Sequence, residues 1–338
     1  MEDLIFKLSN IFYIKDNNDA LAPAVEELSK YAETTIDKNG NIIGILGDKK
    51  SKKHIMLDAH IDQIGLVVTN ILENGFLKVA PCGGIDSRIL PGSTLKIYGK
   101  KVITGIVCCT PPHLIKNKDN KYLKVDELYI DTGLSTEEAT ENIPLYSFVG
   151  FNNTPQKLLN NKITAPALDN RAGVAALIYC AKILSKMEID LKVSIVLSSG
   201  EETTTIGAKT ASFDIFPQES IAVDVSFGTD PTVSKENKGI LGSGPMIGFA
   251  PSLSKEISQK LIKLSKKNDI PYQYEIMGGK TGTNADEISI TKGGIKAGLV
   301  SIPIRYMHTP VEVADISDIK NTAKLLALYI KKGGCFSE

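Results

Sequence analysis

The chain has 338 residues, of which 42% are hydrophobic and 23% are charged. That composition is typical of a globular protein with a sizeable core and is unlike that of disordered chains. The 39 Lys and Arg residues balance the 39 Asp and Glu residues, so bulk charge argues against a nucleic-acid-binding protein and against attraction to an anionic membrane.

The five cysteines include no Cys-x-x-Cys pair, which argues against a disulfide framework and against a cysteine zinc site. The first residues, MEDLIFKLSN, lack the basic start and long apolar stretch of a secretory signal. The most apolar stretch, residues 172–181, is too short to span a bilayer. We therefore expect a cytoplasmic protein with no membrane partner.

Hydrophobic patterns predict alternating strands and helices. Short apolar runs rich in β-branched residues predict strands at residues 42–46, 54–57, 66–71, 193–197 and 221–225. Helical periodicity predicts helices at residues 19–34, 172–186, 254–268 and 315–332. Asp169–Asn170 and Ser317–Asp318 offer oxygens for the starts of two of these helices. Helices that alternate with buried strands indicate an α/β sandwich.

The middle of the chain has a different texture. From about residue 66 to residue 162, short strands alternate with Gly, Pro and polar turns, and a brief helix is expected near residues 135–142. This pattern predicts a small β-rich insert, with linkers near residues 64–65 and 160–162. We expect residues 1–65 and 163–338 to form the α/β domain and residues 66–162 to form the insert.

Five segments place His, Asp or Glu at or just beyond the end of a strand-like run. They are DAHID (58–62), ALDNR (167–171), SSGEE (198–202), AVDVS (222–226) and RYMHTP (305–310). In an open α/β sheet, ligand sites gather where strands end in loops. Imidazole and carboxylate groups without thiolate form a ligand set suited to zinc, cobalt or manganese.

A pair of metal ions roughly 3.5–4 Å apart needs about five protein groups if one carboxylate bridges, and such a pair activates a shared water. The candidate metal ligands are His60, Asp169, Glu202, Asp224 and His308. Glu201 lies next to a candidate ligand and is placed to take a proton from the water and deliver it to a leaving amine. Asp62 should share a face with His60 and orient its imidazole.

Each of these residues also has a structural interpretation. A single His or Asp at a strand end more often makes structural hydrogen bonds, and the Glu201–Glu202 doublet alone would be a solvated turn. His54 and His113 are expected to be structural, the first on a strand and the second in a Pro-Pro loop. The functional interpretation depends on the five segments together.

The chain uses Lys almost throughout, yet two of its three arginines lie beside candidate ligands. Arg171 follows Asp169 by two residues, and Arg305 precedes His308 by three. Because a planar guanidinium is suited to positioning carboxylates, we expect both arginines to orient acidic groups near the metals.

Read together and in order, these segments resemble the tetrahedral aminopeptidases, the glutamyl aminopeptidase family of dinuclear zinc metallopeptidases, some of which are labelled cellulases. The resemblance covers nearly the whole chain. AHIDQIGLVVTNI is similar to the first ligand segment, ALDNRAGVAAL to the bridging-aspartate segment, EE…GAKTA to the base-and-ligand segment, and IPIRYMHTPVEVADI to the last one. GGIDSRILPG and TPPHL…ELYIDTG resemble parts of the family's inserted domain.

The resemblance implies a role for each candidate. His60 and Asp224 would hold one metal, Glu202 and His308 the other, and Asp169 would bridge the two. Glu201 would be the general base, and Asp62 would support the centre. The cofactors would be two divalent ions, zinc first, with cobalt or manganese as alternatives.

The same resemblance implies an α/β/α sandwich of the zinc-peptidase type, with a mixed sheet and a small inserted β-barrel-like domain. That domain would mediate dimerisation, and the dimers would build homo-oligomers such as dodecamers. The implied partners are peptide substrates, without nucleic acid. The implied reaction is removal of N-terminal residues from peptides.

The sequence departs from the family pattern at several positions. Gln63 stands where many relatives have Glu, Gly200 where a Gln is common, and Asn284 where an Asp is common. Residues 203–206, Thr-Thr-Thr-Ile, replace a Val-Gly-Leu-Arg type of turn. These changes remove neither a ligand nor the base, so they bear on side-chain preference and rate.

Three other functions remain open. A dinuclear carboxypeptidase or deacylase would use the same metals on different substrates. A glycosidase needs two carboxyl groups and usually an aromatic platform, and this chain has no Trp. A binding or scaffold protein on this fold would need no ligands, yet the full set is present.

Overall fold

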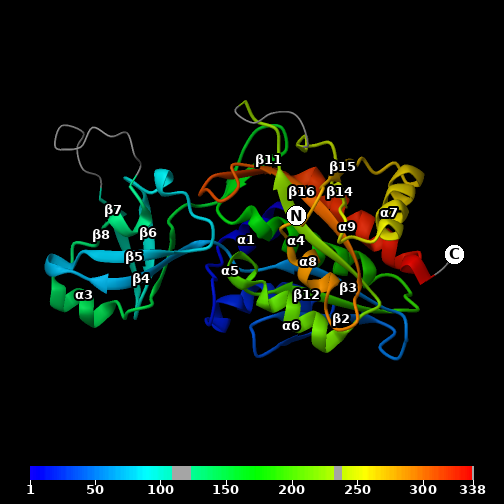
Figure 1. The fold of residues 1–338 in the computed structure, drawn as a ribbon, viewed down its shortest axis with the longest axis horizontal. Coiled ribbons are helices and arrows are strands. Elements are labelled where there is room, and N and C mark those ends of the chain that lie inside the picture. The colour runs from blue at the N-terminus through cyan, green and yellow to red at the C-terminus, as the bar shows by residue number, and fades with distance from the viewer. Residues whose placement is uncertain (109–122, 232–237, 337–338) are drawn as a thin grey trace. The chain divides into compact units, whose positions relative to one another are not determined.

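A computed structural model of the chain describes residues 1–108, 123–231 and 238–336. Its internal contacts divide the chain into two compact units (Figure 1). The larger unit comprises Met1–Gln63, Pro155–Met307 and Val311–Glu338, and the smaller comprises Ile64–Thr154 and His308–Pro310. The TPPHL segment, with His113, lies outside the described residues.

The larger unit is built on an 11-stranded mixed sheet. In spatial order its strands are β1 (Glu33–Ile36), β2 (Ile42–Gly47), β12 (Lys192–Ser198), β3 (His54–His60), β13 (Glu219–Phe227), β16 (Lys296–Arg305), β17 (Glu312–Asp315), β11 (Lys162–Ala165) and β10 (Gln156–Lys157). Two further strands, β14 (Met246–Phe249) and β15 (Gln273–Ile276), extend from β16. Four of the five strands expected from the sequence lie in this sheet, and the fifth, at residues 66–71, lies in the smaller unit.

Four central strands, β12, β3, β13 and β16, run parallel, and the flanking strands are mostly antiparallel. All seven residues of β3 are buried. Continuous burial of this kind is typical of a parallel strand covered on both faces by helices. The carboxyl ends of the four strands therefore meet along one edge of the sheet.

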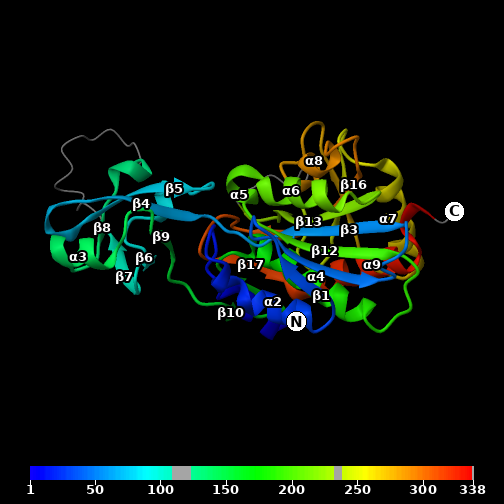
Figure 2. The same cartoon turned by 90° about the horizontal axis from the view of Figure 1, so that it is seen from below.

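Helices pack on both faces of this sheet (Figure 2). They are α1 (Glu2–Ser9), α2 (Ala22–Ser29), α4 (Leu168–Leu184), α5 (Glu201–Thr204), α6 (Ile206–Ile215), α7 (Lys255–Lys267), α8 (Asn284–Ser289) and α9 (Ile316–Lys331), with 3₁₀ turns at Asn18–Leu21 and Gly334–Phe336. Ile55 and Leu57 of β3 join the core formed with α4 and α9, whereas Met56 packs with residues of α6 and α8 on the opposite face. The expected α/β/α sandwich with a mixed sheet is confirmed.

One helix boundary differs clearly from the sequence prediction. The helix expected at residues 19–34 ends at Ser29, and Glu33–Ile36 forms β1 instead. The β-branched run of Thr34, Thr35 and Ile36 favours a strand, and it finds an antiparallel partner in β2. Pairing with a strand thus overrides helical periodicity at the end of this segment.

The expected helix-start oxygens are partly correct. Asn170 accepts a hydrogen bond from the backbone N–H of Gly173 at 3.0 Å through Oδ1, which satisfies one free donor of the first turn of α4. Asp315, rather than Ser317 or Asp318, caps α9 by accepting from the Ser317 N–H at 2.9 Å. Asp315 precedes the first helical residue, which is where a capping oxygen is needed.

The smaller unit is a closed barrel. Its strands, in order, are β4 (Gly65–Ile71), β5 (Leu77–Cys82), β8 (Ile130–Asp131), β7 (Val102–Val107), β6 (Thr94–Tyr98) and β9 (Phe148–Phe151). The remaining elements are α3 (Thr136–Asn142) and 3₁₀ turns at Glu73–Gly75, Ser87–Ile89 and Val125–Glu127. The expected β-barrel-like insert is confirmed, and Ser135 caps the expected short helix. The predicted range of 66–162 extends beyond the barrel, because β10 pairs with β11 in the sheet of the larger unit.

Among the described residues, no helix has both the length and the apolar character that a bilayer crossing requires.

His54, expected to be structural, begins β3 and is buried, with Nε2 2.8 Å from the hydroxyl of Ser194. Burial, together with the charge of Lys192, lowers the pKa of His54 to about 4. The unfolded chain binds this proton near pH 6.5, so the stabilising effect is complete above that pH and is lost as the pH falls through 4.

We predict that lowering the pH from 7.5 to 5 destabilises the protein through His54 by about 2 kcal/mol, and that His54→Gln abolishes this contribution. Urea denaturation of both proteins at the two pH values measures the difference, and the comparison cancels the titration of all other groups. An equal pH dependence in the two proteins would contradict the assignment.

Candidate metal centre

The site lies at the carboxyl edge of the parallel strands in the larger unit. His60 is the last residue of β3, and Asp224 lies near the end of the adjacent strand β13. On the other side of β3, β12 ends at Ser198, and Glu201 and Glu202 follow in α5. Neighbouring parallel strands bring these residues, far apart in sequence, to one place.

One group of candidate ligands surrounds the imidazole of His60. Its Nε2 lies 3.1 Å from Oδ1 of Asp169 and 3.7 Å from Oδ1 of Asp224. The ligand atoms of these three residues lie within 4.8 Å of one another, and all three residues are buried. Nδ1 of His60 faces the backbone oxygen of Asp62 at 3.2 Å, so a proton on Nδ1 leaves Nε2 as the lone-pair donor.

Asp169 reaches a second carboxylate as well. One of its oxygens lies within 4.8 Å of an oxygen of Glu202. Asp169 is in the first turn of α4, where its backbone is not helical and its peptide bond to Asn170 is cis. Its N–H donates to Oε2 of Glu312 at 3.0 Å. Asp169 therefore stands between the His60–Asp224 pair and Glu202.

Asp62 supports the acidic doublet. Its Oδ1 accepts from the N–H of Glu201 at 3.0 Å, and its Oδ2 accepts from the N–H of Glu202 at 3.1 Å. Its Oδ1 lies 3.6 Å from Nδ1 of His60, farther than the backbone oxygen. The expectation that its carboxylate orients the imidazole is thus only partly correct: the backbone oxygen is the nearer partner, and the carboxylate anchors the turn at the start of α5.

The carboxylates strongly influence one another and the imidazole. Burial lowers the pKa of His60, but the hydrogen bond to Asp169 and the nearby carboxylates of Asp224 and Asp62 outweigh it and hold the pKa well above the ordinary value. Burial raises the pKa of Asp224. Burial and the neighbouring carboxylates together raise the pKa of Glu201 to about 8, although the charge of His60 opposes the shift. The surroundings thus favour positive charge at the centre.

His308 belongs to the smaller unit, where its Nδ1 lies 3.1 Å from the backbone oxygen of Gly84. A carbonyl partner at Nδ1 leaves Nε2 available as a ligand. Its place in a second group with Asp169 and Glu202 stays a prediction from the sequence.

The donor set fits divalent metal ions. It combines imidazole nitrogen with carboxylate oxygens and has no thiolate, which suits zinc, cobalt or manganese. Buried carboxylates that converge in this way are costly unless a positive charge balances them. A bound cation would supply that charge.

We expected Arg171 to orient acidic groups, but its hydrogen-bond partners are backbone oxygens and an amide. The side chain is fully buried, and its guanidinium donates to the backbone oxygens of Leu8 and Ile11, each at 3.2 Å, and to that of Ile61. Its remaining bond goes to Oε1 of Gln63 at 3.3 Å. Arg171 therefore joins backbone segments around the site and makes no hydrogen bond to a carboxylate.

Arg305 likewise binds the backbone: its Nε donates to the carbonyl oxygen of Thr229 at 2.7 Å.

Arg171 remains charged at neutral pH. Burial lowers its pKa to about 10, although the charges of Asp62 and Asp169 oppose the shift. Its charge contributes to the electrostatics of the site without direct contact with the acids.

Two of the departures from the family pattern have structural partners. Gln63 accepts from Arg171, as a neutral acceptor for a buried cation. Nδ2 of Asn284 donates to Oδ2 of Asp58 at 2.8 Å and to the hydroxyl of Ser198 at 2.9 Å. Both side chains thus belong to the layer that surrounds the candidate ligands.

Sequence reasoning missed two carboxylates, Glu312 and Glu275. Glu312 is buried and accepts from the N–H of Asp169. Its signal was its position four residues after His308 in the same segment. Glu275, on β15, receives a hydrogen bond from the hydroxyl of Ser301 at 2.5 Å. Nothing near Glu275 in the sequence marked it.

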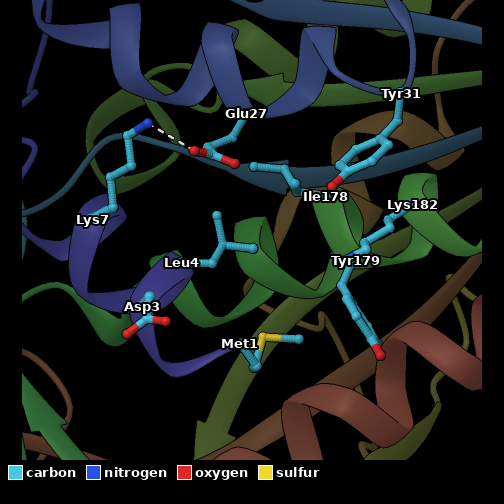
Figure 3. A pocket seen from close by; sticks show the side chains of 9 residues that line it. All are labelled: Met1, Asp3, Leu4, Lys7, Glu27, Tyr31, Ile178, Tyr179 and Lys182. Atoms are coloured by element: carbon cyan, nitrogen blue, oxygen red, sulfur yellow. Dashed lines mark hydrogen bonds and ion pairs between the residues drawn. The ribbon is translucent and has the colours of Figure 1, made fainter.

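A separate pocket in the larger unit lies between α1, α2 and α4 (Figure 3). Met1 and Leu4 of α1 and Tyr179 of α4 are among its lining residues. In this pocket the Nζ of Lys7 donates to Oε1 of Glu27 at 2.7 Å, so these two charges neutralise each other. None of its nine lining residues is a His or a Cys, so it lacks the imidazole that the candidate centre contains.

Comparisons with known proteins agree with this geometry. A family model described as M42 glutamyl aminopeptidase matches residues 40–325. A lysyl aminopeptidase from Pyrococcus furiosus is 35% identical over 305 residues, covering 89% of this chain and 87% of its own length.

Solved structures give the same result. An aminopeptidase from Desulfurococcus kamchatkensis superposes with a TM-score of 0.91 at 31% identity, covering 98% of this chain and 94% of its own. The Pyrococcus horikoshii TET1 peptidase, described as assembling into a tetrahedron or a large octahedral shell, gives 0.86 at 30% identity, with coverage of 97% and 98%.

We predict that Arg171→Lys lowers the free energy of unfolding by about 2–4 kcal/mol, because one ammonium group cannot satisfy four acceptors spread around a planar fork. Chemical denaturation measures the loss. Arg88→Lys is the matched control, because Arg88 is exposed and its ion pair with Asp86 contributes little. Equal stability of Arg171→Lys and wild type would disprove the scaffolding role.

Proposed function

Because the chain belongs to the M42 glutamyl aminopeptidase family, we propose that it removes N-terminal residues from peptides at a centre that holds two divalent metal ions. Membership makes the protein a hydrolase of the metallopeptidase type. The observation that carries the two-metal proposal is the convergence of His60, Asp169 and Asp224, with Glu202 beside Asp169.

The residues would divide between two ions. We assign His60 and Asp224 to one ion, Glu202 and His308 to the other, and Asp169 to both. The position of Asp169 between His60 and Glu202 supports its bridging role. When bound, such ions act as Lewis acids that polarise the peptide carbonyl and acidify water. Zinc is the ion we place first, with cobalt and manganese as alternatives.

Glu201 is the proposed general base. Its carboxylate would accept a proton from the attacking water and then donate it to the departing amine, and a group that exchanges protons near neutral pH is suited to both steps. Burial raises its pKa into that range. Asp62 is the proposed supporting residue, because it fixes the backbone of both Glu201 and its neighbour.

The substrate would be a peptide with a free amino terminus. The family description names glutamyl substrates and the Pyrococcus furiosus relative is a lysyl enzyme, so these names do not agree on the side chain. A carboxypeptidase or deacylase with the same metals is the alternative within the reaction class. A non-catalytic scaffold is the alternative outside it.

We also propose that the protein is a homo-oligomer in the cytoplasm. The TET1 peptidase, similar over nearly its whole length, forms shells. In the barrel, Val102 and Ile106 of β7 are 58% and 54% exposed, and apolar side chains on one strand suit contact with a second copy. The cysteines Cys82, Cys108, Cys180 and Cys335 are free thiols, as in a reducing compartment.

We predict that Glu201→Gln lowers kcat by roughly 10²–10⁴-fold while the bound metal remains, because Gln cannot accept the proton. Asp169→Ala should lose both activity and metal, because it removes the shared carboxylate. Turnover of an aminoacyl chromogenic substrate and elemental analysis measure the two properties.

The control for both variants is Glu188→Gln, which changes an exposed glutamate in the loop after α4. It should retain wild-type activity and metal. Full activity of Glu201→Gln would refute its role as the base, and full metal content in Asp169→Ala would refute the bridging role.

We also predict that cleavage requires a free amino terminus on the substrate and a bound divalent metal on the enzyme. Peptides with a free amino terminus should be cleaved, and the same peptides with an acetylated terminus should resist cleavage. Chelation should abolish the activity, and zinc, cobalt or manganese should restore it. Preference for the acetylated peptides would favour the deacylase, and cleavage from the carboxyl end would favour the carboxypeptidase.

A further inference from the structure

Glu275 is a carboxylate near the centre that the proposed mechanism does not use. It lies on β15, and its Oε2 accepts from the hydroxyl of Ser301 at 2.5 Å. A second hydroxyl, that of Ser226, also hydrogen-bonds to it. Ser301 and Ser226 belong to β16 and β13, so the side chain of Glu275 reaches back over the sheet from its edge.

These contacts place Glu275 close to the candidate ligands. Ser301 is the direct sheet partner of Asp224, and Ser226 lies two residues beyond Asp224 on the same strand and face. Neighbouring strands are about 4.8 Å apart, and two residues along a strand span about 6.6 Å. The two hydroxyls thus hold the Glu275 carboxylate over the face of the sheet that carries Asp224, close enough for the charge of Asp224 to act on it and outside the candidate ligand group.

The charge of Glu275 lacks a protein partner. Within the described parts of the chain, no Lys, Arg or His nitrogen forms an ion pair with it. The side chain is partly buried, burial raises its pKa, and the negative charge of Asp224 raises it further. A carboxylate withdrawn from water with only two hydroxyl partners is costly, and it still has lone pairs free to accept.

Apolar side chains lie on the same face of the sheet as Ser226 and Ser301. Leu299, Ala222 and Ala285 form a small buried cluster on this face of the sheet, and Met277 packs against it. Met277 follows Glu275 by two residues, so the two side chains leave the chain on the same side. The partly exposed Met277, next to a carboxylate without an ion pair, suits a side chain with a methylene stem and a cationic head.

An N-terminal lysine carries two cations, and they lie at different distances from the reacting carbonyl carbon. The α-ammonium nitrogen of a peptide lies two bonds, about 2.5 Å, from the carbonyl carbon that reacts at the centre. The head of an extended lysine lies about 6 Å from its Cα. An extended side chain of that length would carry its cationic head beyond the candidate metal ligands, whereas the α-ammonium would remain among them.

We propose that Glu275 binds the cationic side chain of an N-terminal lysine or arginine and makes the enzyme selective for basic residues. The inference rests on the proposed aminopeptidase function and specifies its substrate class. Ser301 and Ser226 hold the carboxylate in place, and Met277 contacts the stem of the substrate side chain.

The test compares lysyl and norleucyl chromogenic substrates, which share the four-carbon stem and differ in the ammonium group. Wild-type enzyme should show a kcat/KM for the lysyl substrate at least tenfold higher. Glu275→Gln should reduce the lysyl-to-norleucyl ratio on the order of 30-fold, and Glu275→Asp should retain more of the preference because it keeps the charge. Glu188→Gln, at an exposed glutamate, should leave the ratio unchanged.

The outcomes separate the two levels of the argument. Wild-type activity on norleucyl substrate equal to or above that on lysyl substrate would overturn the role of Glu275 and leave the aminopeptidase intact. A parallel loss on both substrates in Glu275→Gln would make the residue structural and would also overturn it. Absence of activity on every free-amine substrate, with metal supplied, would instead overturn the proposed function.

Discussion

Asp62, Asp169 and Asp224 place three carboxylates around the imidazole of His60, in a part of the larger unit that is nearly closed to water. Such charges repel one another and lose hydration, so the surrounding structure must balance them. The protein itself offsets part of this negative charge. Two backbone N–H groups donate hydrogen bonds to Asp62, and the raised pKa of His60 favours its protonated, positively charged form. The rest suits divalent cations, which is why the arrangement favours metal chemistry over a purely structural network.

Arg171 stabilises the backbone around the site without forming an ion pair with any of these three carboxylates. Its guanidinium binds three backbone oxygens and the amide of Gln63, and so it connects the segment after α1, the end of β3 and the start of α4. A carboxylate partner would neutralise Arg171 locally, but it would also hold the charge of that acid away from the centre. With neutral acceptors, the positive charge of Arg171 acts on Asp62 and Asp169 at a distance.

The acidic side chains fall into two groups by position. The acids around His60 lie close enough together to share small ions. Glu275 comes from β15 at the edge of the sheet, and its carboxylate is held by hydroxyl groups outside that ligand group. In this arrangement the substrate contributes the positive charge that the protein does not provide at Glu275.

The sequence by itself determined the layers, the β-rich insert and the acids at strand ends, because hydrophobic periodicity reports which face of each element is buried and where each element stops. It also marked Glu201 and Glu202 as a pair after a strand. Only the tertiary structure decided the partners: the carboxylate of Asp62 meets the start of α5 because β12 lies beside β3, and Glu275 reaches Ser301 because β14 joins two strands distant in sequence. Periodicity is a local property, whereas hydrogen-bond partners depend on which strands become neighbours, and that is settled by long-range pairing.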